Sequence, residues 1–241
     1  MPASPVPRRR WWLLSFLLLL CLLAWDAVGL DLPLARWFGA ASGFAWRDRA
    51  LFMLLTHELP RHLALALVLA LAWGAWRPWG FLRRLAPWER LQLLASVLLA
   101  LATVALLKRV SATSCPWDLA EFGGIARYVS HWAWALQDGG SGHCFPAGHA
   151  SAALAFLAPW PLLRRVAPAL AVSWLVWALA CGMALGGFQQ MRGAHYLSHT
   201  LWSAWICWTL GLALDGALHA LRAQHRAIGP QASAAAVPGR R

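Results

Sequence analysis

The sequence predicts an all-α fold, a polytopic membrane protein with six transmembrane helices. Hydrophobic residues make up 60% of the 241 residues and charged residues only 12%, whereas a typical soluble domain has about 45–50% apolar and about 25% charged residues. The mean hydropathy is +0.53, and the apolar residues gather in long segments between polar connections. These values exclude a disordered chain, a collagen-like chain and a small disulfide-bonded scaffold.

Six apolar segments account for the expected helices, because a spanning helix needs roughly 17–25 mostly apolar residues. The first covers residues 11–30 and follows three arginines. It is longer than the apolar core of a cleaved signal peptide, which is the alternative interpretation of this segment. The second, over residues 62–76, is short and is expected to draw on flanking residues. The other segments cover residues 91–107, 145–163, 166–185 and 196–214.

Three further stretches connect or follow these segments. Residues 31–61 mix apolar clusters with charge, which predicts one or two amphipathic helices on the outer face of the membrane. Residues 108–144 form the longest polar connection, and a long structured loop is usually functional. Residues 223–241 are expected to be a disordered cytoplasmic tail, so that residues 1–222 form a single membrane domain.

The formal net charge of +12 arises from 21 basic and 9 acidic residues. In a soluble protein this excess would suggest a nucleic-acid partner. Here the basic residues lie mostly between apolar segments, so no nucleic acid is expected. Because cytoplasmic loops carry an excess of Lys and Arg, the distribution favours both termini in the cytoplasm. We expect a multi-pass protein of the inner membrane, in contact with membrane lipids, and the sequence leaves its oligomeric state open.

Polar residues cluster at the outer ends of the third to sixth segments, over residues 108–118, 139–149 and 189–199. They combine a lysine, arginines, histidines and a glycine-rich turn. Lys and Arg suit phosphate oxygens, and successive backbone N–H groups of such a turn bind anions. Histidines can attack phosphorus or protonate a leaving oxygen. The combination predicts phosphoryl transfer to water in one pocket on the extracytoplasmic side.

These three stretches resemble the signature motifs of the PAP2 (type 2 phosphatidic acid phosphatase) superfamily, Lys-x6-Arg-Pro, Pro-Ser-Gly-His and Ser-Arg-x5-His-x3-Asp. Lys108 and Pro116 stand at the spacing of the first motif, and Pro146-Ala147-Gly148-His149 follows the second. His195 followed by Tyr196-Leu197-Ser198 matches the centre of the third. The resemblance covers residues 91–214. It implies a PAP2-like helical bundle and a phosphatase that needs neither a metal nor a cofactor, with a lipid phosphate or diphosphate as substrate.

The resemblance also implies a role for each matching residue. His195 is expected to be the nucleophile that forms a phosphohistidine, His149 the general acid for the leaving group, and Lys108 a phosphate ligand. His199 stands where the family has an aspartate, and we expect it to accept a hydrogen bond that orients His195. Three loop carboxylates are the alternatives for this orienting role: Asp118, Glu121 and Asp138.

Other positions depart from the family pattern. Cys115 replaces the arginine of the first motif, Ala147 the serine of the second, and Phe188-Gln189 the Ser-Arg pair of the third. Neighbouring residues are expected to supply the missing phosphate contacts, namely Arg109, Arg192, Ser141, Gly148 and His143. Because Cys115 lies directly before Pro116 and Cys144 directly before Phe145-Pro146, and an oxidising periplasm permits the bond, we expect a disulfide between them.

Three alternatives remain open. The departures suggest a catalytically degenerate family member. A polar-cavity membrane transporter would need polar residues near mid-membrane, and the second, third and fifth segments have almost none. A zinc enzyme is suggested by the i, i+4 spacing of His195 and His199, but the chain has no His-Glu-x-x-His pattern. For His57 and His131 we expect only hydrogen bonds to neighbouring groups.

Overall fold

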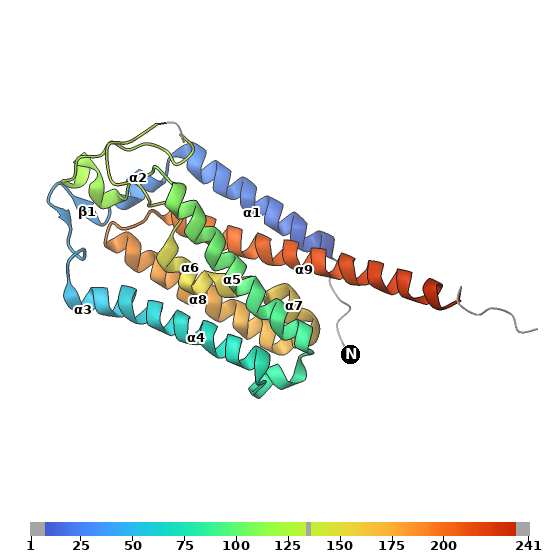
Figure 1. The fold of residues 1–241 in the computed structure, drawn as a ribbon. Helices are drawn as coiled ribbons and strands as arrows, with labels where there is room; N and C mark the ends of the chain where they lie inside the picture. Colours follow the sequence, from blue (N-terminus) through green and yellow to red (C-terminus); the bar gives the residue numbers. More distant parts are fainter. Residues whose placement is uncertain (1–7, 134–135, 235–241) are drawn as a thin grey trace, which may run out of the picture.

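A computed structural model describes residues 8–133 and 136–234 and shows a bundle of long helices whose longest loops gather at one end (Figure 1). The helices are α1 (Arg8–Val28), α2 (Asp31–Ala35), α3 (Ala50–Met53), α4 (Leu59–Trp76), α5 (Pro87–Val110), α6 (Gly148–Leu154), α7 (Trp160–Val166), α8 (Pro168–Met191) and α9 (Leu197–Ala234). Two short strands, β1 (Gly39–Ala40) and β2 (Gly43–Phe44), pair antiparallel, with Gly39 opposite Phe44.

Five helical stretches of the described chain are long and apolar enough to cross a membrane. They cover residues 8–28, 50–84, 87–110, 168–191 and 197–225. The described chain is therefore mostly helical and has helices that could span a membrane, but the predicted count of six spans is not confirmed. The expected fourth span, over residues 145–163, is divided into α6, a 3-10 turn and α7. Pro159 and Pro161 account for the break, because proline cannot continue a helix without losing a hydrogen bond.

The divided segment forms the interior of the bundle. Every residue from 154 to 163 is buried, and α6 and α7 pack against α5, α8 and α9. Small residues allow the close approach. A Cβ at Gly182 of α8 would lie 2.3 Å from the side chain of Leu154, and one at Gly186 would lie 2.3 Å from that of Thr200. The interior segment carries the second motif at its outer end, so this packing fixes His149.

The amphipathic helices expected over residues 31–61 are not what the structure shows. Residues 31–44 form α2 and the β1–β2 hairpin, and residues 50–58 run as α3 and a π-helical turn directly into α4. The second span therefore begins earlier than predicted. Gly43 has a φ of +99°, a conformation that suits glycine in a tight turn. The ring of Phe44 packs 4.9 Å from that of Phe122, which attaches the hairpin to the long outer loop.

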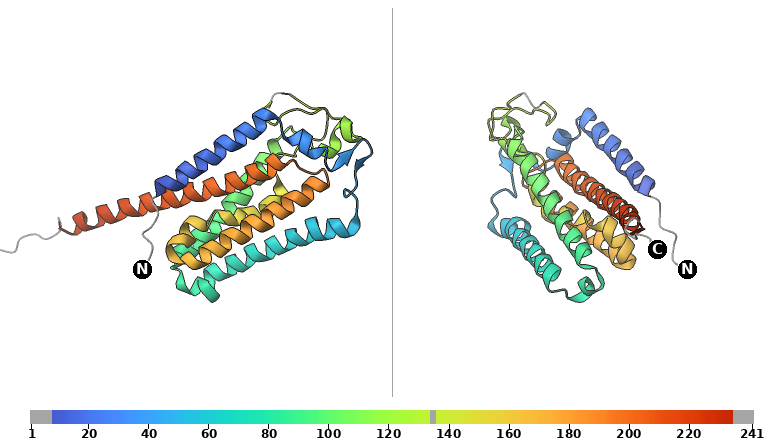
Figure 2. Two further views of the ribbon diagram at one scale, coloured as in Figure 1. Left: turned by 180° about the vertical axis from the view of Figure 1, so that it is seen from behind. Right: turned by 45° about the vertical axis from the view of Figure 1, so that its right-hand side comes forward.

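The first apolar segment is an integral helix of the bundle. Figure 2 shows α1 lying alongside α9, and the two helices are in contact. The hydroxyls of Ser15 and Thr209 lie 2.8 Å apart, and the indole N–H of Trp205 donates to the carbonyl of Ser15 over 2.9 Å. These contacts attach α1 to α9 along its length.

The expected disordered tail is helical in part. The helix α9 continues to Ala234, so residues 223–234 of this tail are drawn as helix. Alanine occurs four times in this stretch and glutamine twice, and both residues favour helix. Residues 235–241 of the predicted tail lie outside the described residues.

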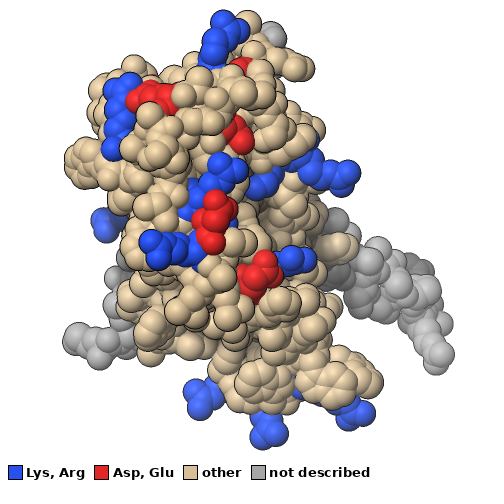
Figure 3. Space-filling view, turned by 90° about the vertical axis from the view of Figure 1, so that its left-hand side faces the viewer, with Lys and Arg blue, Asp and Glu red and all other residues tan. Residues whose placement is uncertain are grey.

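Charged side chains are distributed unequally between the ends of the bundle. The connection between α4 and α5 exposes Arg77, Arg83 and Arg84 and has no acidic residue. It lies at the bottom of Figures 1 and 3, where Figure 3 shows basic side chains alone, whereas acidic and basic side chains lie together higher on the same face. The predicted orientation would place this connection in the cytoplasm, and that orientation stays a prediction.

Candidate active site

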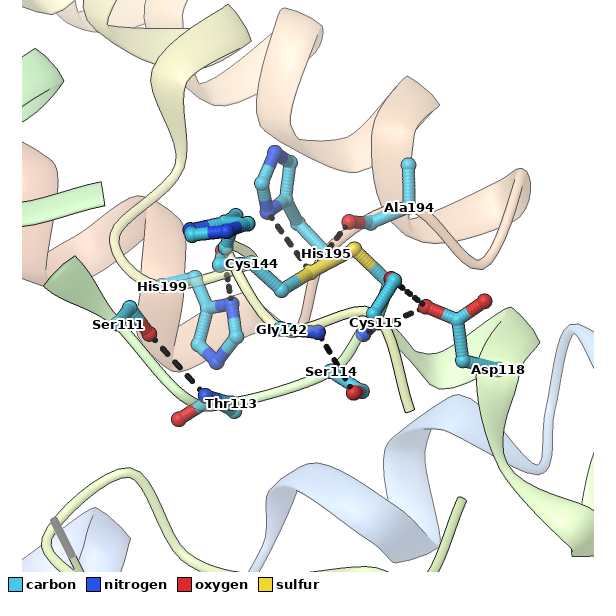
Figure 4. The surroundings of a disulfide bond; sticks show 12 residues. Ser111, Thr113, Ser114, Cys115, Asp118, Gly142, Cys144, Ala194, His195 and His199 are labelled. Atoms are coloured by element: carbon cyan, nitrogen blue, oxygen red, sulfur yellow. Dashed lines mark hydrogen bonds between the residues drawn. A yellow bond between two sulfur atoms is a disulfide. The ribbon is translucent and has the colours of Figure 1, made fainter. Parts of the chain in front are cut away.

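A disulfide between Cys115 and Cys144 holds the long outer loop together, as the sequence predicted (Figure 4). The two Cα atoms lie 5.1 Å apart. The backbone N–H of His143 donates to the carbonyl of Ser111 over 2.8 Å, and that of Cys144 donates to the carbonyl of Thr113 over 2.9 Å. The end of the first motif is thereby fastened to the start of the second.

His195 lies in the turn between α8 and α9 and is 1% exposed. Its Nε2 lies 3.3 Å from Nδ1 of His149, and its Nδ1 lies 3.6 Å from Sγ of Cys144. Burial lowers the pKa of His195 well below its ordinary value, and the nearby cation Lys108 acts in the same direction. The imidazole is therefore neutral at physiological pH, which a nitrogen nucleophile requires.

The contacts of His195 favour one tautomer. If Nδ1 carries the proton and faces the disulfide sulfur, which is a weak acceptor, then Nε2 has a free lone pair. Nδ1 of His149 would then donate its proton to that lone pair across the 3.3 Å contact. A phosphate entering between the two rings would meet a nucleophilic nitrogen on one side and an N–H donor on the other. These are the roles that the sequence assigned to His195 and His149.

Lys108 completes the group of matching residues. It belongs to the last turn of α5, and its side chain crosses the start of α6. A Cβ at Gly148 would lie 3.3 Å from Cδ and 3.7 Å from Nζ of Lys108, so the glycine of the second motif gives the lysine room. The structure thus brings Lys108, His149 and His195 together from three separate elements, as predicted, with Gly148 beside them.

His199 does not form the predicted hydrogen bond to His195. Its Nδ1 instead pairs with the backbone carbonyl of Cys144 over 3.0 Å, and its ring centroid lies 5.9 Å from that of His195. A backbone carbonyl only accepts, so Nδ1 of His199 must be the donor. His199 therefore fastens the disulfide-bonded loop to α9 and acts on His195 only through that loop.

This contact predicts opposite outcomes for two substitutions of His199. His199→Asn keeps an N–H donor and is expected to retain most of the activity. His199→Asp places a carboxylate against the Cys144 carbonyl at a site that is 1% exposed, where a buried unsatisfied group costs about 1–3 kcal/mol and a charged one more. Thermal unfolding and kcat/KM of both variants test this. An aspartate variant as stable and active as the asparagine variant would contradict the assigned contact.

The loop carboxylates do not orient His195 either, because each has another partner. Asp138 accepts hydrogen bonds from the backbone N–H and the hydroxyl of Ser114 over 2.6 and 2.7 Å. Asp118 accepts one from the hydroxyl of Ser141 over 2.9 Å, and Glu121 pairs with Arg36 at 2.5 Å. These carboxylates stabilise the loop that carries the disulfide.

Arg192 is buried, and its guanidinium is hydrogen-bonded to other residues of the protein. Its Nη1 donates to the side-chain oxygen of Gln189 over 3.2 Å, and its Nε donates to the carbonyl of Arg47 over 3.3 Å. Its guanidinium also lies 5.8 Å from the ring centroid of Trp117. Gln189 stands where the third motif of the family has its arginine. Arg192 follows one helical turn later, and its guanidinium contacts the Gln189 side chain.

The other three predicted phosphate ligands are exposed to solvent. Arg109 is exposed, as is Ser141, whose hydroxyl is bonded to Asp118. His143 is also exposed, and its Nδ1 lies 3.4 Å from the backbone carbonyl of Lys108. Their contacts with phosphate stay a prediction.

Two histidines for which the sequence predicted no role beyond hydrogen bonding lie next to the site. The ring of His57 lies 4.3 Å from that of His149, centroid to centroid. His131 stacks on Phe145 at 4.1 Å, and its Nε2 lies 3.2 Å from a carboxylate oxygen of Asp26. Neither belongs to a motif, so only their position in the fold identifies them. His131 links the outer loop to α1, whereas His57 touches a residue of the predicted machinery.

One group of possible metal ligands is present among the described residues, formed by Cys144, His195 and His199, whose ligand atoms lie within 4.8 Å of one another. The sulfur of Cys144 is bonded to Cys115, and a metal binds thiolate rather than a disulfide. The donor set therefore does not suit the zinc enzyme considered from the sequence.

The fold and the site together describe a mostly helical chain with helices that could span a membrane, and a pair of histidines in contact at one end of its bundle. The model of the PAP2 superfamily matches residues 89–221. This is more than half of the chain, and the chain belongs to that superfamily. Members of the superfamily are generally phosphatases, which supports phosphatase activity here. No significant match to a curated protein or to a solved structure is found.

Proposed function

We propose that the protein hydrolyses a lipid phosphate or diphosphate monoester at the outer face of the inner membrane, through a phosphohistidine intermediate on His195. The attacking atom is Nε2 of His195, which forms a bond to phosphorus while His149 protonates the departing oxygen. Lys108 offsets the charge of the phosphate oxygens. Water then attacks phosphorus, His149 takes up its proton, and phosphate leaves.

The observation that carries the lipid assignment is an apolar groove between α4 and α8. It has a volume of about 620 Å³, within the range of about 300–1,000 Å³ that is typical of small-molecule sites. Leu55 and Leu59 line one part of it and flank His57, and Ala152 and Ala153 follow His149 by one helical turn. The groove therefore reaches within one helical turn of His149.

The groove extends from there along α4 to Trp79. Its other lining residues are nearly all apolar, which suits one hydrocarbon chain of the substrate and not a polar metabolite. A lipid with its phosphate at the histidines can place its chain in this groove. The site end of the bundle would then face the extracytoplasmic side, as the charge distribution favours.

Filling the far part of the groove is expected to select against long chains. Ala70 lines the groove and lies 13 residues beyond His57, about 20 Å along a helix that rises 1.5 Å per residue. Ala70→Phe should raise KM for a long-chain lipid phosphate by about tenfold, the cost of roughly 1.4 kcal/mol of lost apolar contact. Its KM for a short-chain phosphate should not change.

Phosphate release from purified protein over a panel of lipid phosphates and diphosphates of different chain lengths measures both effects. Ala66→Phe is the matched control, because Ala66 is exposed on the same helix and does not line the groove. Activity on soluble phosphate esters alone, or equal effects of the two variants, would contradict the lipid assignment. An absence of hydrolysis with every substrate would indicate a degenerate family member.

A further inference from the structure

His57 stands in direct contact with the general acid of the proposed reaction. Its ring lies 4.3 Å from that of His149, centroid to centroid, at an interplanar angle of 49°. Its Nδ1 is 2.7 Å from a carboxylate oxygen of Glu58. Glu58 fixes one side of the His57 ring, and the ring covers one side of His149.

The backbone holds His57 at this place. It lies in the π-helical turn Leu54–Glu58, and such turns often occur at functional sites. The carbonyl of Thr56 accepts a hydrogen bond of 3.0 Å from the side-chain amide of Gln189, and the Thr56 hydroxyl donates to the carbonyl of Phe52 over 2.7 Å. The turn is therefore anchored to the end of α8, immediately before the residues that carry His195.

The three histidines form a row with His149 in the middle. His149 contacts both His195 and His57, while no ring contact between His57 and His195 exists in the described part of the chain. The nucleophile approaches phosphorus from the side of His195, so the leaving group departs on the side of His149. His57 lies beyond His149 and hence on the leaving-group side.

We propose that His57, held by Glu58, is a positioning residue for the general acid His149. The inference rests on the proposed function. In the first step a bond forms between phosphorus and Nε2 of His195, the bond from phosphorus to the leaving oxygen breaks, and the proton of His149 moves to that oxygen. The His57 ring limits rotation of the His149 ring and keeps its N–H directed at the leaving oxygen.

The test compares two leaving groups. An alkoxide needs a proton in order to leave, whereas nitrophenolate does not. Because general acid catalysis contributes about 10²–10⁴-fold, misdirecting the acid in His57→Ala should lower kcat for an alkyl phosphate by at least about tenfold. With nitrophenyl phosphate kcat should change by less than about twofold, since the acid contributes little there. KM should stay the same for both substrates.

Glu58→Ala should show the same pattern more weakly, and it keeps the test available if His57→Ala does not fold.

His62→Ala is the matched control, because His62 lies on the same helix and its Nδ1 pairs with the backbone carbonyl of Glu58 over 2.8 Å. Equal losses with both leaving groups would indicate a structural role and overturn the proposal, as would unchanged alkyl phosphate turnover in both His57→Ala and Glu58→Ala. A loss in His62→Ala equal to that in His57→Ala would also overturn it. Wild-type protein that hydrolyses neither substrate would overturn the proposed function and this inference with it, whereas active wild type with unaffected variants overturns the inference alone.

Discussion

His195→Ala is expected to abolish phosphate release and His149→Ala to reduce it severely. Removing the nucleophile leaves no atom to accept the phosphoryl group, so the loss should exceed about 10³-fold. Removing the general acid should cost about 10²–10⁴-fold with an alkyl phosphate. Initial rates of phosphate release by the purified variants measure both effects.

The two variants should differ in what they accumulate. With nitrophenyl phosphate, His149→Ala can still form the phosphohistidine, because the leaving group departs unprotonated, but it lacks the base for hydrolysis. It should therefore show a burst of nitrophenolate and a protein mass increased by one phosphoryl group. His195→Ala should show neither. His219→Ala is a suitable control, because His219 is exposed on the far part of α9. A burst from His195→Ala would move the nucleophile to another residue.

The sequence predicted the residues that carry chemistry better than the contacts that position them. Lys108, His149 and His195 were recognisable because their spacing follows family motifs, and the structure brings them together. The partner of His199 was not predictable, because its acceptor is the backbone carbonyl of Cys144, and any residue at position 144 has a carbonyl. His57 was overlooked for a similar reason, since a turn outside every motif places it against His149.

Some parts of the fold were likewise predictable from the sequence, and others were not. Long apolar runs predicted the five helices of the described chain that could span a membrane, because hydrophobic length is the main requirement for crossing a bilayer. The segment over residues 145–163 is equally apolar, but it lies inside the bundle in short helices. Hydropathy shows that a segment is apolar but not whether lipid or protein surrounds it. The only sequence signal of the break between α6 and α7 is the pair Pro159 and Pro161. The hairpin over residues 39–44 depends on its packing against Phe122, far along the chain.

Removing the disulfide is expected to have the second large effect, on stability and on catalysis together. A disulfide contributes about 2–4 kcal/mol in typical proteins by restricting the unfolded chain, and here the two cysteines are 29 residues apart. Cys115→Ala should therefore lower the unfolding temperature and loosen the loop that leads from His143 into the start of α6, next to His149. A loss of kcat/KM of at least about tenfold is expected, since small displacements of catalytic groups are costly. Cys21→Ser, which removes an exposed free thiol, should behave like wild type.

Comparing Cys115→Ala with Cys144→Ala separates the cross-link from the sulfur beside the nucleophile. Both variants lose the bond, but only Cys144→Ala loses the sulfur that lies 3.6 Å from Nδ1 of His195. That sulfur is the nearest side-chain group to Nδ1 among the described contacts, so its loss frees the ring to change tautomer or rotate. Cys144→Ala should consequently have the lower kcat, with an unfolding temperature equal to that of Cys115→Ala. Equal kcat values would show that the disulfide serves the loop alone, and full activity after complete reduction, verified by thiol alkylation, would show that neither role is needed.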